Sequence, residues 1–331
     1  MQYSRYKDEK TITCLLCQHY CTLKKGKTGI CGININHNGK LKNLTYAHPS
    51  ALNLDPIEKK PLYHFLPSSL SLSIGTVGCN FRCPFCQNHT ISQTSHVNEK
   101  TYYPPEAVVE LALSNGAKSI SYTYNEPTIW YPYAKDIGVL AKKAGLKNVF
   151  VTSGYESQEV LEDMQSWVDG VNVDLKSFSK KYYKEVLKTS LKGVLATLKK
   201  LSKTTIHTEV TTLIIPGVND TKEELSSMAE FIATKMDKSI PWHLSAFYPS
   251  FKMQETSPTP IAKLFEAQKI GKDAGLEYVY LGNVAYDSST YCPKCEALLI
   301  QRERYSSKIV DLDMQKFTCK SCGYHIKGVW K

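Results

Sequence analysis

Three closely spaced cysteines are the part of this sequence best suited to do chemistry. Cys79, Cys83 and Cys86 lie in the segment GTVGCNFRCPFCQNH, residues 75–89, with the spacing C-x3-C-x2-C. Each iron of a [4Fe–4S] cluster needs one ligand from outside the cluster, and cysteine thiolate is the usual one. Three cysteines on one loop leave the fourth corner open, just as catalytic zinc sites keep one position open. The loop therefore predicts a [4Fe–4S] cluster with one iron free to bind a substrate or cofactor.

The other eight of the eleven cysteines form two complete groups of four, so none remains to supply the missing ligand. The chain begins without the apolar core of a signal peptide, and it has no run of about 18 apolar residues. We expect a cytoplasmic protein with no membrane segment, in a reducing compartment where clustered cysteines hold metals rather than disulfides. The N-terminal quartet is Cys14, Cys17, Cys21 and Cys31, and the C-terminal quartet is Cys292, Cys295, Cys319 and Cys322.

The two quartets differ in how far their spacing defines the metal. The C-terminal pairs CPKC and CKSC, at 292–295 and 319–322, have the spacing of a zinc ribbon, in which four thiolates close one tetrahedral site. The N-terminal spacing, C-x2-C-x3-C-x9-C, allows either zinc or an auxiliary iron–sulfur cluster by ligand type. We favour zinc or another single ion there and keep the cluster as the alternative.

The net charge of +10 is concentrated at the two ends of the chain. Lysine and arginine outnumber aspartate and glutamate by 10 to 4 in residues 1–68 and by 8 to 5 in residues 285–331. A nucleic-acid surface is one interpretation; the other, which we favour, is that lysines offset the negative charge of thiolate-bound metals. A non-catalytic nucleic-acid-binding metalloprotein would have no reason to leave a cluster corner open.

Strand-like and helix-like segments alternate between residues 69 and 284. Apolar runs such as SLSIGTV (71–77) are followed by amphipathic stretches such as PEAVVELALSNG (105–116), and one long helix is expected over 180–201. This alternation predicts parallel βαβ units in a complete or partial (β/α) barrel, with its chemistry at the carboxyl ends of the strands. We therefore expect an α/β protein in three parts: an N-terminal cysteine-rich arm with an extended connector (1–68), the barrel (69–284) and a zinc ribbon (285–331).

A three-cysteine loop after the first barrel strand, with Phe85 just before the last cysteine, resembles the radical S-adenosylmethionine (SAM) superfamily. The resemblance implies that the methionine part of SAM binds the open iron. The barrel resembles the pyruvate formate-lyase activating enzyme branch, in which TYNEP (123–127) takes the place of a Gly-Gly-Glu-Pro segment that holds the SAM amino group. Glu126 matches that segment, whereas Tyr124 and Asn125 replace its glycines. Two alternatives follow: the backbone contact of this segment is tighter, or the Asn125 side chain replaces it.

Two further segments resemble SAM-binding positions of the same branch. VDLK (173–176) matches a segment in which Asp174 and Lys176 contact SAM, with Lys176 as the partner of the SAM carboxylate. His243, in PWHLSAF, matches a histidine near the ribose. Motifs such as DPIEKKPLYHF, NVDLKSF and EVTTLIIPGVND run in order along nearly the whole chain and resemble the radical SAM member of the AmmeMemoRadiSam system.

The resemblance implies an enzyme that reductively cleaves SAM to methionine and a 5′-deoxyadenosyl radical, which abstracts hydrogen from an unidentified substrate. It implies a reductant such as ferredoxin or flavodoxin and allows a protein partner from the AmmeMemoRadiSam system. Activation of a glycyl-radical enzyme is one version of this function. Modification of a small molecule, lipid or polypeptide is another.

Overall fold

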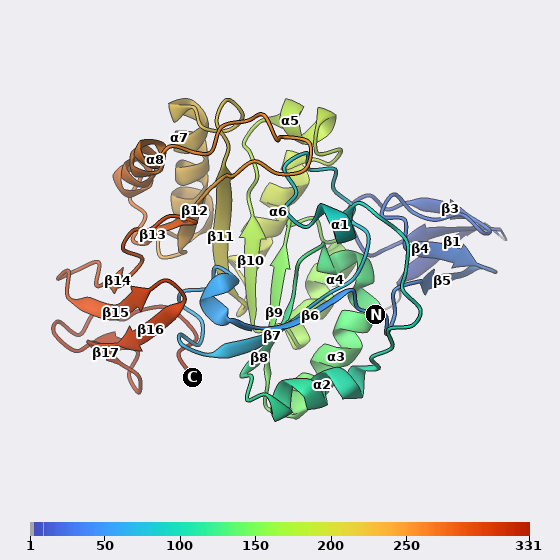
Figure 1. Ribbon diagram of the computed structural model, residues 1–331, viewed down its shortest axis with the longest axis horizontal. Coiled ribbons are helices and arrows are strands. Elements are labelled where there is room, and N and C mark those ends of the chain that lie inside the picture. Colours follow the sequence, from blue (N-terminus) through green and yellow to red (C-terminus); the bar gives the residue numbers. More distant parts are fainter. Residues whose placement is uncertain (1–2, 9) are drawn as a thin grey trace.

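A sheet of eight strands forms the centre of the computed structural model, which describes residues 3–8 and 10–331 (Figure 1). Its order is β13-β12-β11-β10-β9-β8-β7-β6, and the seven strands from β7 to β13 run parallel. No pairing between β13 and β6 closes the sheet within the described part of the chain, so the barrel is partial. The parallel strands are β7 (Leu70–Gly75), β8 (Ser119–Tyr122), β9 (Lys147–Thr152), β10 (Gly170–Asp174), β11 (His207–Ile214), β12 (Trp242–Ala246) and β13 (Val279–Gly282).

Helices connect the parallel strands and cover the outer face of the sheet (Figure 1). Val171, Asn172 and Val173 of β10 are all fully buried, as expected for a parallel strand packed on both faces. The main helices are α2 (Pro105–Ser114), α3 (Tyr131–Lys143), α4 (Gln158–Asp163), α5 (Lys180–Glu185), α6 (Leu191–Leu201), α7 (Lys222–Phe231) and α8 (Ile261–Asp273). Short helical turns are η1 (Ile57–Lys59), η2 (Pro127–Trp130), η3 (Met164–Ser166) and η4 (Ile232–Asp237). No helix in the described ranges has the length and apolarity needed to cross a membrane.

The prediction of one helix over residues 180–201 was wrong, because the structure has two. α5 ends at Glu185, and Lys188 adopts a positive φ of 60°, which a continuous right-handed helix does not allow. α6 then starts after Ser190. The break lies between a helix that packs near the three-cysteine loop and one that covers the sheet.

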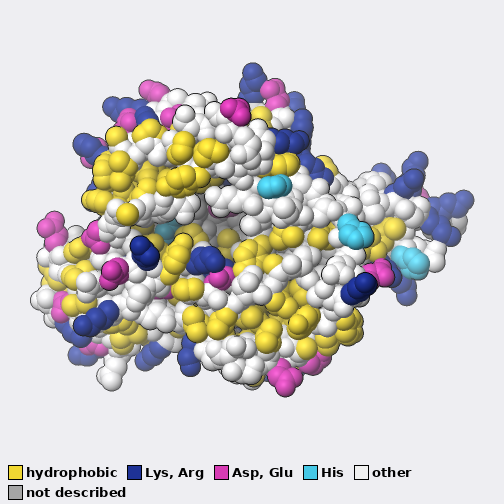
Figure 2. Space-filling model, in the orientation of Figure 1, with side chains coloured by type: hydrophobic (Ala, Val, Ile, Leu, Met, Phe, Trp, Pro, Cys, Tyr) yellow, Lys and Arg dark blue, Asp and Glu magenta, His cyan; other side chains and the backbone are white. Residues whose placement is uncertain are grey.

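The N-terminal arm is built from two small sheets at one side of the barrel (Figure 1). β1 (Ser4–Asp8), β2 (Thr11–Cys14) and β3 (Thr22–Lys24) form one, and β4 (Asn34–His37) and β5 (Lys40–Asn43) form the other. Lys and Arg side chains gather at the outer end of this arm in Figure 2. The positive charge of the arm faces solvent, because its exposed lysines are Lys7, Lys10, Lys24, Lys25, Lys27, Lys40 and Lys42.

The connector after the arm is more ordered than an extended linker. Its strand β6 (Ala51–Pro56) pairs antiparallel with β7 and forms one edge of the central sheet. Asp55 on β6 accepts hydrogen bonds from Lys60 Nζ at 2.7 Å and from the Tyr124 hydroxyl at 2.8 Å, which ties this edge to the end of β8. The boundaries at residues 68/69 and 284/285 stay a prediction.

The C-terminal segment packs against the amino ends of the barrel strands. Its strands are β14 (Thr290–Tyr291), β15 (Leu298–Glu303), β16 (Ser306–Ile309), β17 (Leu312–Asp313) and β18 (Thr318–Cys319). Arg302 on β15 donates to the Tyr63 carbonyl at 2.5 Å, and the Tyr280 hydroxyl is 2.8 Å from Thr290 Oγ1. The C-terminal segment therefore covers the end of the barrel opposite to the three-cysteine loop.

Candidate active site

The three-cysteine loop lies at the carboxyl ends of the parallel strands, as the barrel prediction requires. It joins β7 to the short helix α1 (His89–Ser92), and Cys79, Cys83 and Cys86 all line a cavity of about 260 Å³. Side chains from the ends of the following strands complete the lining. They include Thr123, Tyr124, Asn125, Glu126, Thr152, Ser153, Asp174, Lys176, Thr211, Leu213, Ser245 and Asn283, and the loop itself adds Phe85 and Asn88.

Glu126 is held in place by donors from two neighbouring strand ends. Its Oε1 accepts from the hydroxyls of Thr128 at 2.7 Å and Thr152 at 2.8 Å, and its Oε2 accepts from the Ser153 backbone N–H at 2.8 Å. Burial and the adjacent Glu126 carboxylate raise the pKa of Glu156 to about 7, so Glu156 is only partly ionised near neutral pH. Glu126 therefore has a fixed orientation in the cavity wall and can accept a hydrogen bond from a bound cationic group.

Lys176 and Asp174, at and just after the carboxyl end of β10, form an ion pair in the cavity wall. Lys176 Nζ lies 2.7 Å from Asp174 Oδ2, and it lies 6.0 Å from the centre of the Phe81 ring. Burial lowers the pKa of Lys176, but the neighbouring Asp174 and Cys83 groups outweigh burial and raise that pKa above its usual value. Lys176 is therefore a cation beside the cysteine loop with only 11% of its side chain exposed, suited to bind a carboxylate.

Asn125 lines the cavity, but its amide group already has partners in the protein. Its Nδ2 donates to the Gly78 carbonyl at 2.9 Å, and its Oδ1 accepts from Trp130 Nε1 at 3.1 Å. Tyr124, which stands at a glycine position of the related branch, adopts a positive φ of 69°. The conformation that favours glycine is thus kept, while the Asn125 side chain fixes the start of the three-cysteine loop.

Replacing Asn125 by alanine is expected to weaken the loop rather than the binding of SAM. The Asn125→Ala variant would leave buried donors and acceptors unpaired, which costs about 1–3 kcal/mol in the free energy of unfolding, and it should release iron faster. Once the cluster is loaded, the dissociation constant for SAM should change less than about threefold.

The matched control for this variant is Asn148→Ala. Asn148 is also buried, and its Nδ2 donates to the Gly138 carbonyl at 2.9 Å, far from the cavity. Urea unfolding, iron retention and SAM binding measured on both proteins separate the effects. A large loss of SAM affinity in Asn125→Ala alone would show that its amide binds SAM directly.

His243 is not among the residues that line the cavity. Its Nε2 pairs with Glu209 Oε2 at 2.6 Å, and its ring stacks on Tyr280 with centroids 5.3 Å apart. His243 is the second residue of β12, whereas Ser245, two residues further on, reaches the cavity. Because residues i and i+2 of a strand share a face, His243 points to the same interior one layer lower. The geometry gives no support to a contact between His243 and the SAM ribose.

Several residues that line the cavity were not singled out from the sequence. They are polar side chains at the ends of later strands: Thr152, Ser153, Thr211, Ser245 and Asn283. Position was a signal for Thr152, Ser153 and Asn283, which lie at or just after the carboxyl end of a segment predicted as a strand. Thr211 and Ser245 lie within such segments. Serine and threonine are too common for type alone to distinguish them.

Comparison with known proteins identifies the family. The model of the radical SAM superfamily matches residues 73–232, which contain the three-cysteine loop, Glu126 and Lys176. The chain belongs to the radical SAM superfamily. It is also 41% identical over 330 residues to "Uncharacterized protein MJ0808" of Methanocaldococcus jannaschii, covering 98% of each chain.

More distant radical SAM relatives have a range of activities. A GTP 3',8-cyclase of Nautilia profundicola is 24% identical over 254 residues, which cover 70% of this chain and 77% of the cyclase. The crystal structure of a radical SAM methyltransferase from Sphaerobacter thermophilus matches with a TM-score of 0.54 at 13% identity, over 85% of this chain and 77% of that chain. This structural likeness supports the fold and leaves the reaction open.

The superfamily implies a [4Fe–4S] cluster and SAM, and the residues of the cavity fit both. Cys79, Cys83 and Cys86 converge on the cavity, but their sulfurs do not all lie within 4.8 Å of one another, the spacing of ligands around one ion. Thiolates on a cubane bind different irons and so stand further apart. The cavity wall adds a buried ammonium group on Lys176 and a fixed carboxylate on Glu126, which complement the carboxylate and amino groups of SAM.

Both quartets of cysteines form local clusters in this radical SAM protein. In the C-terminal quartet the sulfurs of Cys292 and Cys322 are 3.6 Å apart, as are those of Cys295 and Cys319. All four sulfurs lie within 4.8 Å of one another, so a four-cysteine metal site is present. In the N-terminal quartet Cys14, Cys17 and Cys31 are buried and Cys21 is half-buried.

We expect the C-terminal quartet to hold one zinc ion that does not take part in SAM binding. A Cys295→Ser/Cys319→Ser variant should lose about one zinc per chain and become less stable, because the metal closes a small segment. Its iron content and SAM affinity should match the wild type, since the C-terminal quartet lies at the opposite end of the barrel. Elemental analysis and SAM titration test this; loss of iron in place of zinc would contradict it.

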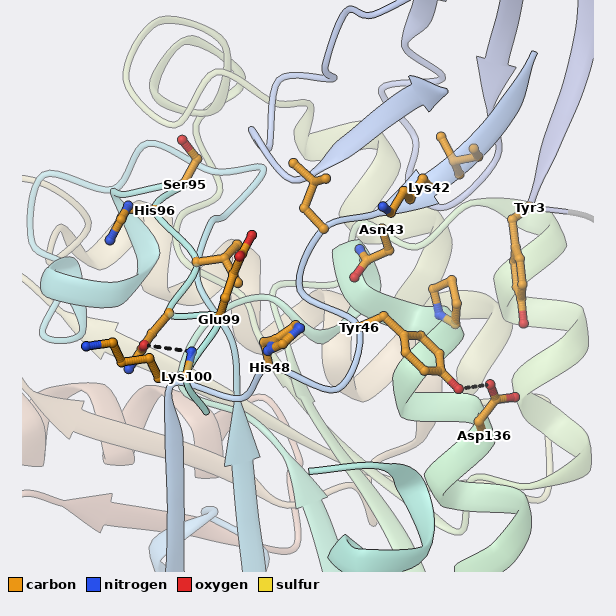
Figure 3. A pocket seen from close by; sticks show the side chains of 15 residues that line it. Tyr3, Lys42, Asn43, Tyr46, His48, Ser95, His96, Glu99, Lys100 and Asp136 are labelled. Carbon is orange, nitrogen blue, oxygen red and sulfur yellow. Dashed lines mark hydrogen bonds between the residues drawn. The ribbon is translucent and has the colours of Figure 1, made fainter. Parts of the chain in front are cut away.

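A larger cavity of about 1210 Å³ lies between the N-terminal arm and α3 (Figure 3). Tyr46 and Asp136 meet at its edge, where the Tyr46 hydroxyl donates to Asp136 Oδ2 at 2.6 Å. No cysteine and none of the SAM-binding candidates lines this cavity. Its size alone therefore does not make it the site of the radical chemistry.

Proposed function

We propose that this protein is an enzyme that generates a 5′-deoxyadenosyl radical and uses it to abstract hydrogen from a substrate. The [4Fe–4S] cluster, when bound, supplies the electron that splits SAM into methionine and that radical. The observation that carries the proposal is the cavity in which three cysteines face Lys176 and Glu126 across the carboxyl ends of the strands. A structural cluster would need no such open space beside it.

Each side chain of the cavity has a separate part in the proposal. Cys79, Cys83 and Cys86 hold three corners of the cluster. Lys176 binds the SAM carboxylate, and Glu126 accepts a hydrogen bond from the SAM amino group. Three other residues support this arrangement. Asp174 orients Lys176, Phe85 packs within the three-cysteine loop, and Asn125 fixes that loop. The proposal does not extend to His243, because Glu209 occupies its Nε2.

The finer assignment is to the radical SAM member of the AmmeMemoRadiSam system. It is supported by the motifs of that family that run in order along the chain. Ferredoxin or flavodoxin would supply the electron. Activation of a glycyl-radical enzyme remains a prediction from the resemblance alone.

Electron paramagnetic resonance of the reduced protein tests whether SAM binds at the cluster. The protein is reconstituted without oxygen, reduced, and measured with and without SAM. We expect SAM to change the g values of the reduced cluster, because it becomes a ligand of the fourth iron. An unchanged spectrum at saturating SAM would contradict the proposed binding mode.

A further inference from the structure

We propose that the N-terminal quartet holds an iron–sulfur cluster rather than a single zinc ion. This differs from the preference drawn from its spacing in the sequence, where both were open. It uses the proposed function in one respect, because the three-cysteine loop serves as an internal comparison. The metal that the quartet takes is nevertheless measurable without any SAM chemistry.

The distances between sulfurs separate the two kinds of site within this one structure. Four sulfurs bound at about 2.3 Å to one tetrahedral zinc ion lie about 3.8 Å apart, and the C-terminal quartet has this spacing, with two pairs at 3.6 Å. Among the described residues it is the only group whose ligand atoms all lie within 4.8 Å of one another. No three sulfurs of the N-terminal quartet meet that limit, although all four cysteines are described.

The N-terminal quartet is nevertheless gathered around one small space. A Cβ at Gly29 would lie 3.5 Å from Cys21 Sγ and 3.8 Å from Cys31 Sγ, so these two sulfurs lie close to the same point. Cys31 Sγ also accepts a hydrogen bond from Asn34 Nδ2 at 3.4 Å. The four thiols are therefore close together, but their sulfurs are further apart than the ligands of a single ion. This spacing is expected for an iron–sulfur cluster, in which each cysteine binds a different iron.

Asn80 provides an independent observation that points to a sulfur ligand. It is fully buried between the two groups: its Oδ1 lies 4.0 Å from Cys79 Sγ, and its side chain also reaches the Cys17 thiol. Its Nδ2 has no hydrogen-bond partner among the described residues. A buried N–H group without a hydrogen-bond partner destabilises the folded protein. A metal-bound thiolate or a cluster sulfide would accept the missing hydrogen bond from Asn80 Nδ2.

The N-terminal quartet also lies directly against the three-cysteine loop. Arg82 donates to the Cys79 carbonyl at 2.7 Å and to the Ile30 carbonyl at 2.6 Å, and so connects the two loops. A Cβ on Gly78 would lie 2.7 Å from the Cys31 carbonyl oxygen, so the two backbones are in close contact. The second cluster would therefore be the immediate neighbour of the SAM-binding one.

The experiment compares metal contents of the full chain after anaerobic reconstitution with ferrous iron and sulfide. The wild type should contain about eight irons and one zinc, or about six irons if the second cluster is [2Fe–2S]. In a Cys79→Ser/Cys83→Ser/Cys86→Ser variant, about four or two irons should remain, with matching acid-labile sulfide and a Mössbauer spectrum of a cluster. About four irons and two zincs in the wild type, and no cluster iron in this variant, would overturn the inference.

Two further variants show whether a loss of iron comes from a lost cluster or from unfolding. They also distinguish a failure of this inference from a failure of the proposed function. The Cys17→Ser/Cys21→Ser variant should lose two to four irons. Adding SAM should still change its electron paramagnetic resonance spectrum. Cys295→Ser/Cys319→Ser, the matched control, should lose only zinc. If the wild type contains the extra irons but its electron paramagnetic resonance spectrum does not change with SAM, the proposed function is contradicted and the second cluster is still supported.

Discussion

Replacing Lys176 by alanine should weaken SAM binding about 10- to 100-fold, since a charge-assisted hydrogen bond of about 1.5–3 kcal/mol is lost. The Lys176 side chain is largely shielded from solvent, and its Nζ lies 2.7 Å from Asp174 Oδ2. Without the ammonium group, Asp174 would remain unpaired in the cavity and repel the SAM carboxylate. The measurement is a titration of the reconstituted protein with SAM, monitored by electron paramagnetic resonance.

The matched control is Lys147→Ala. Lys147 forms a comparable pair with Asp169, at 3.2 Å, but it lies at the amino end of β9. Iron content is determined in both variants, because Lys176 also neighbours Cys83. Equal SAM affinity in Lys176→Ala and the wild type, at equal iron content, would show that Lys176 does not bind SAM.

Replacing Glu209 by alanine should lower the free energy of unfolding by about 3–5 kcal/mol, the cost of removing one partner of a buried charged pair. Glu209 is completely buried inside the amino end of the barrel. Its carboxylate accepts from the backbone N–H of Tyr63 at 3.0 Å and of His64 at 2.8 Å, and it pairs with His207 and His243. All four groups would lose their partner together.

The pH dependence of stability follows from the same carboxylate. Burial raises the pKa of Glu209, but its hydrogen bonds to His207 and His243 outweigh burial and hold that pKa well below the usual value of 4.5. The stabilisation is therefore present above about pH 4.5 and is lost as the pH falls toward the lower, folded-state pKa.

Urea unfolding at pH 7.5 and at pH 4 measures both effects. Glu162→Ala serves as the control, because Glu162 is exposed and pairs only with surface groups, and it should change stability by less than about 0.5 kcal/mol. The deficit of Glu209→Ala should be smaller at pH 4 than at pH 7.5. A loss below about 1 kcal/mol, or one that is the same at both pH values, would contradict this account.

The barrel could be predicted because each parallel strand is a short apolar run between amphipathic helices. The predicted strand at 71–77 corresponds to β7, Leu70–Gly75, and the later strands follow in the same way. β6 was missed because ALNLDP contains a proline and polar residues, and only its pairing with β7 at the sheet edge makes it a strand. The break before α6 depends on the positive φ of Lys188, which lysine does not signal.

The cavity was predictable where residue type and spacing carry chemistry together. The structure brings Cys79, Cys83, Cys86, Glu126 and Lys176 to one cavity. His243 does not line the cavity. It lies two residues before Ser245 on β12, so it shares the inner face of the strand but lies one layer deeper in the barrel. Its partner Glu209 is far away along the sequence, so no local pattern could reveal the pair. The different sulfur spacings of the two quartets likewise depend on how their loops fold.

The most direct test of the open iron site is the amount of 5′-deoxyadenosine formed from SAM. Reconstituted protein is reduced without oxygen, incubated with SAM, and compared with the Cys79→Ala/Cys83→Ala/Cys86→Ala variant. We predict 5′-deoxyadenosine from the wild type and none above background from the variant. A wild type with a full cluster that neither binds SAM nor forms 5′-deoxyadenosine would contradict the central claim.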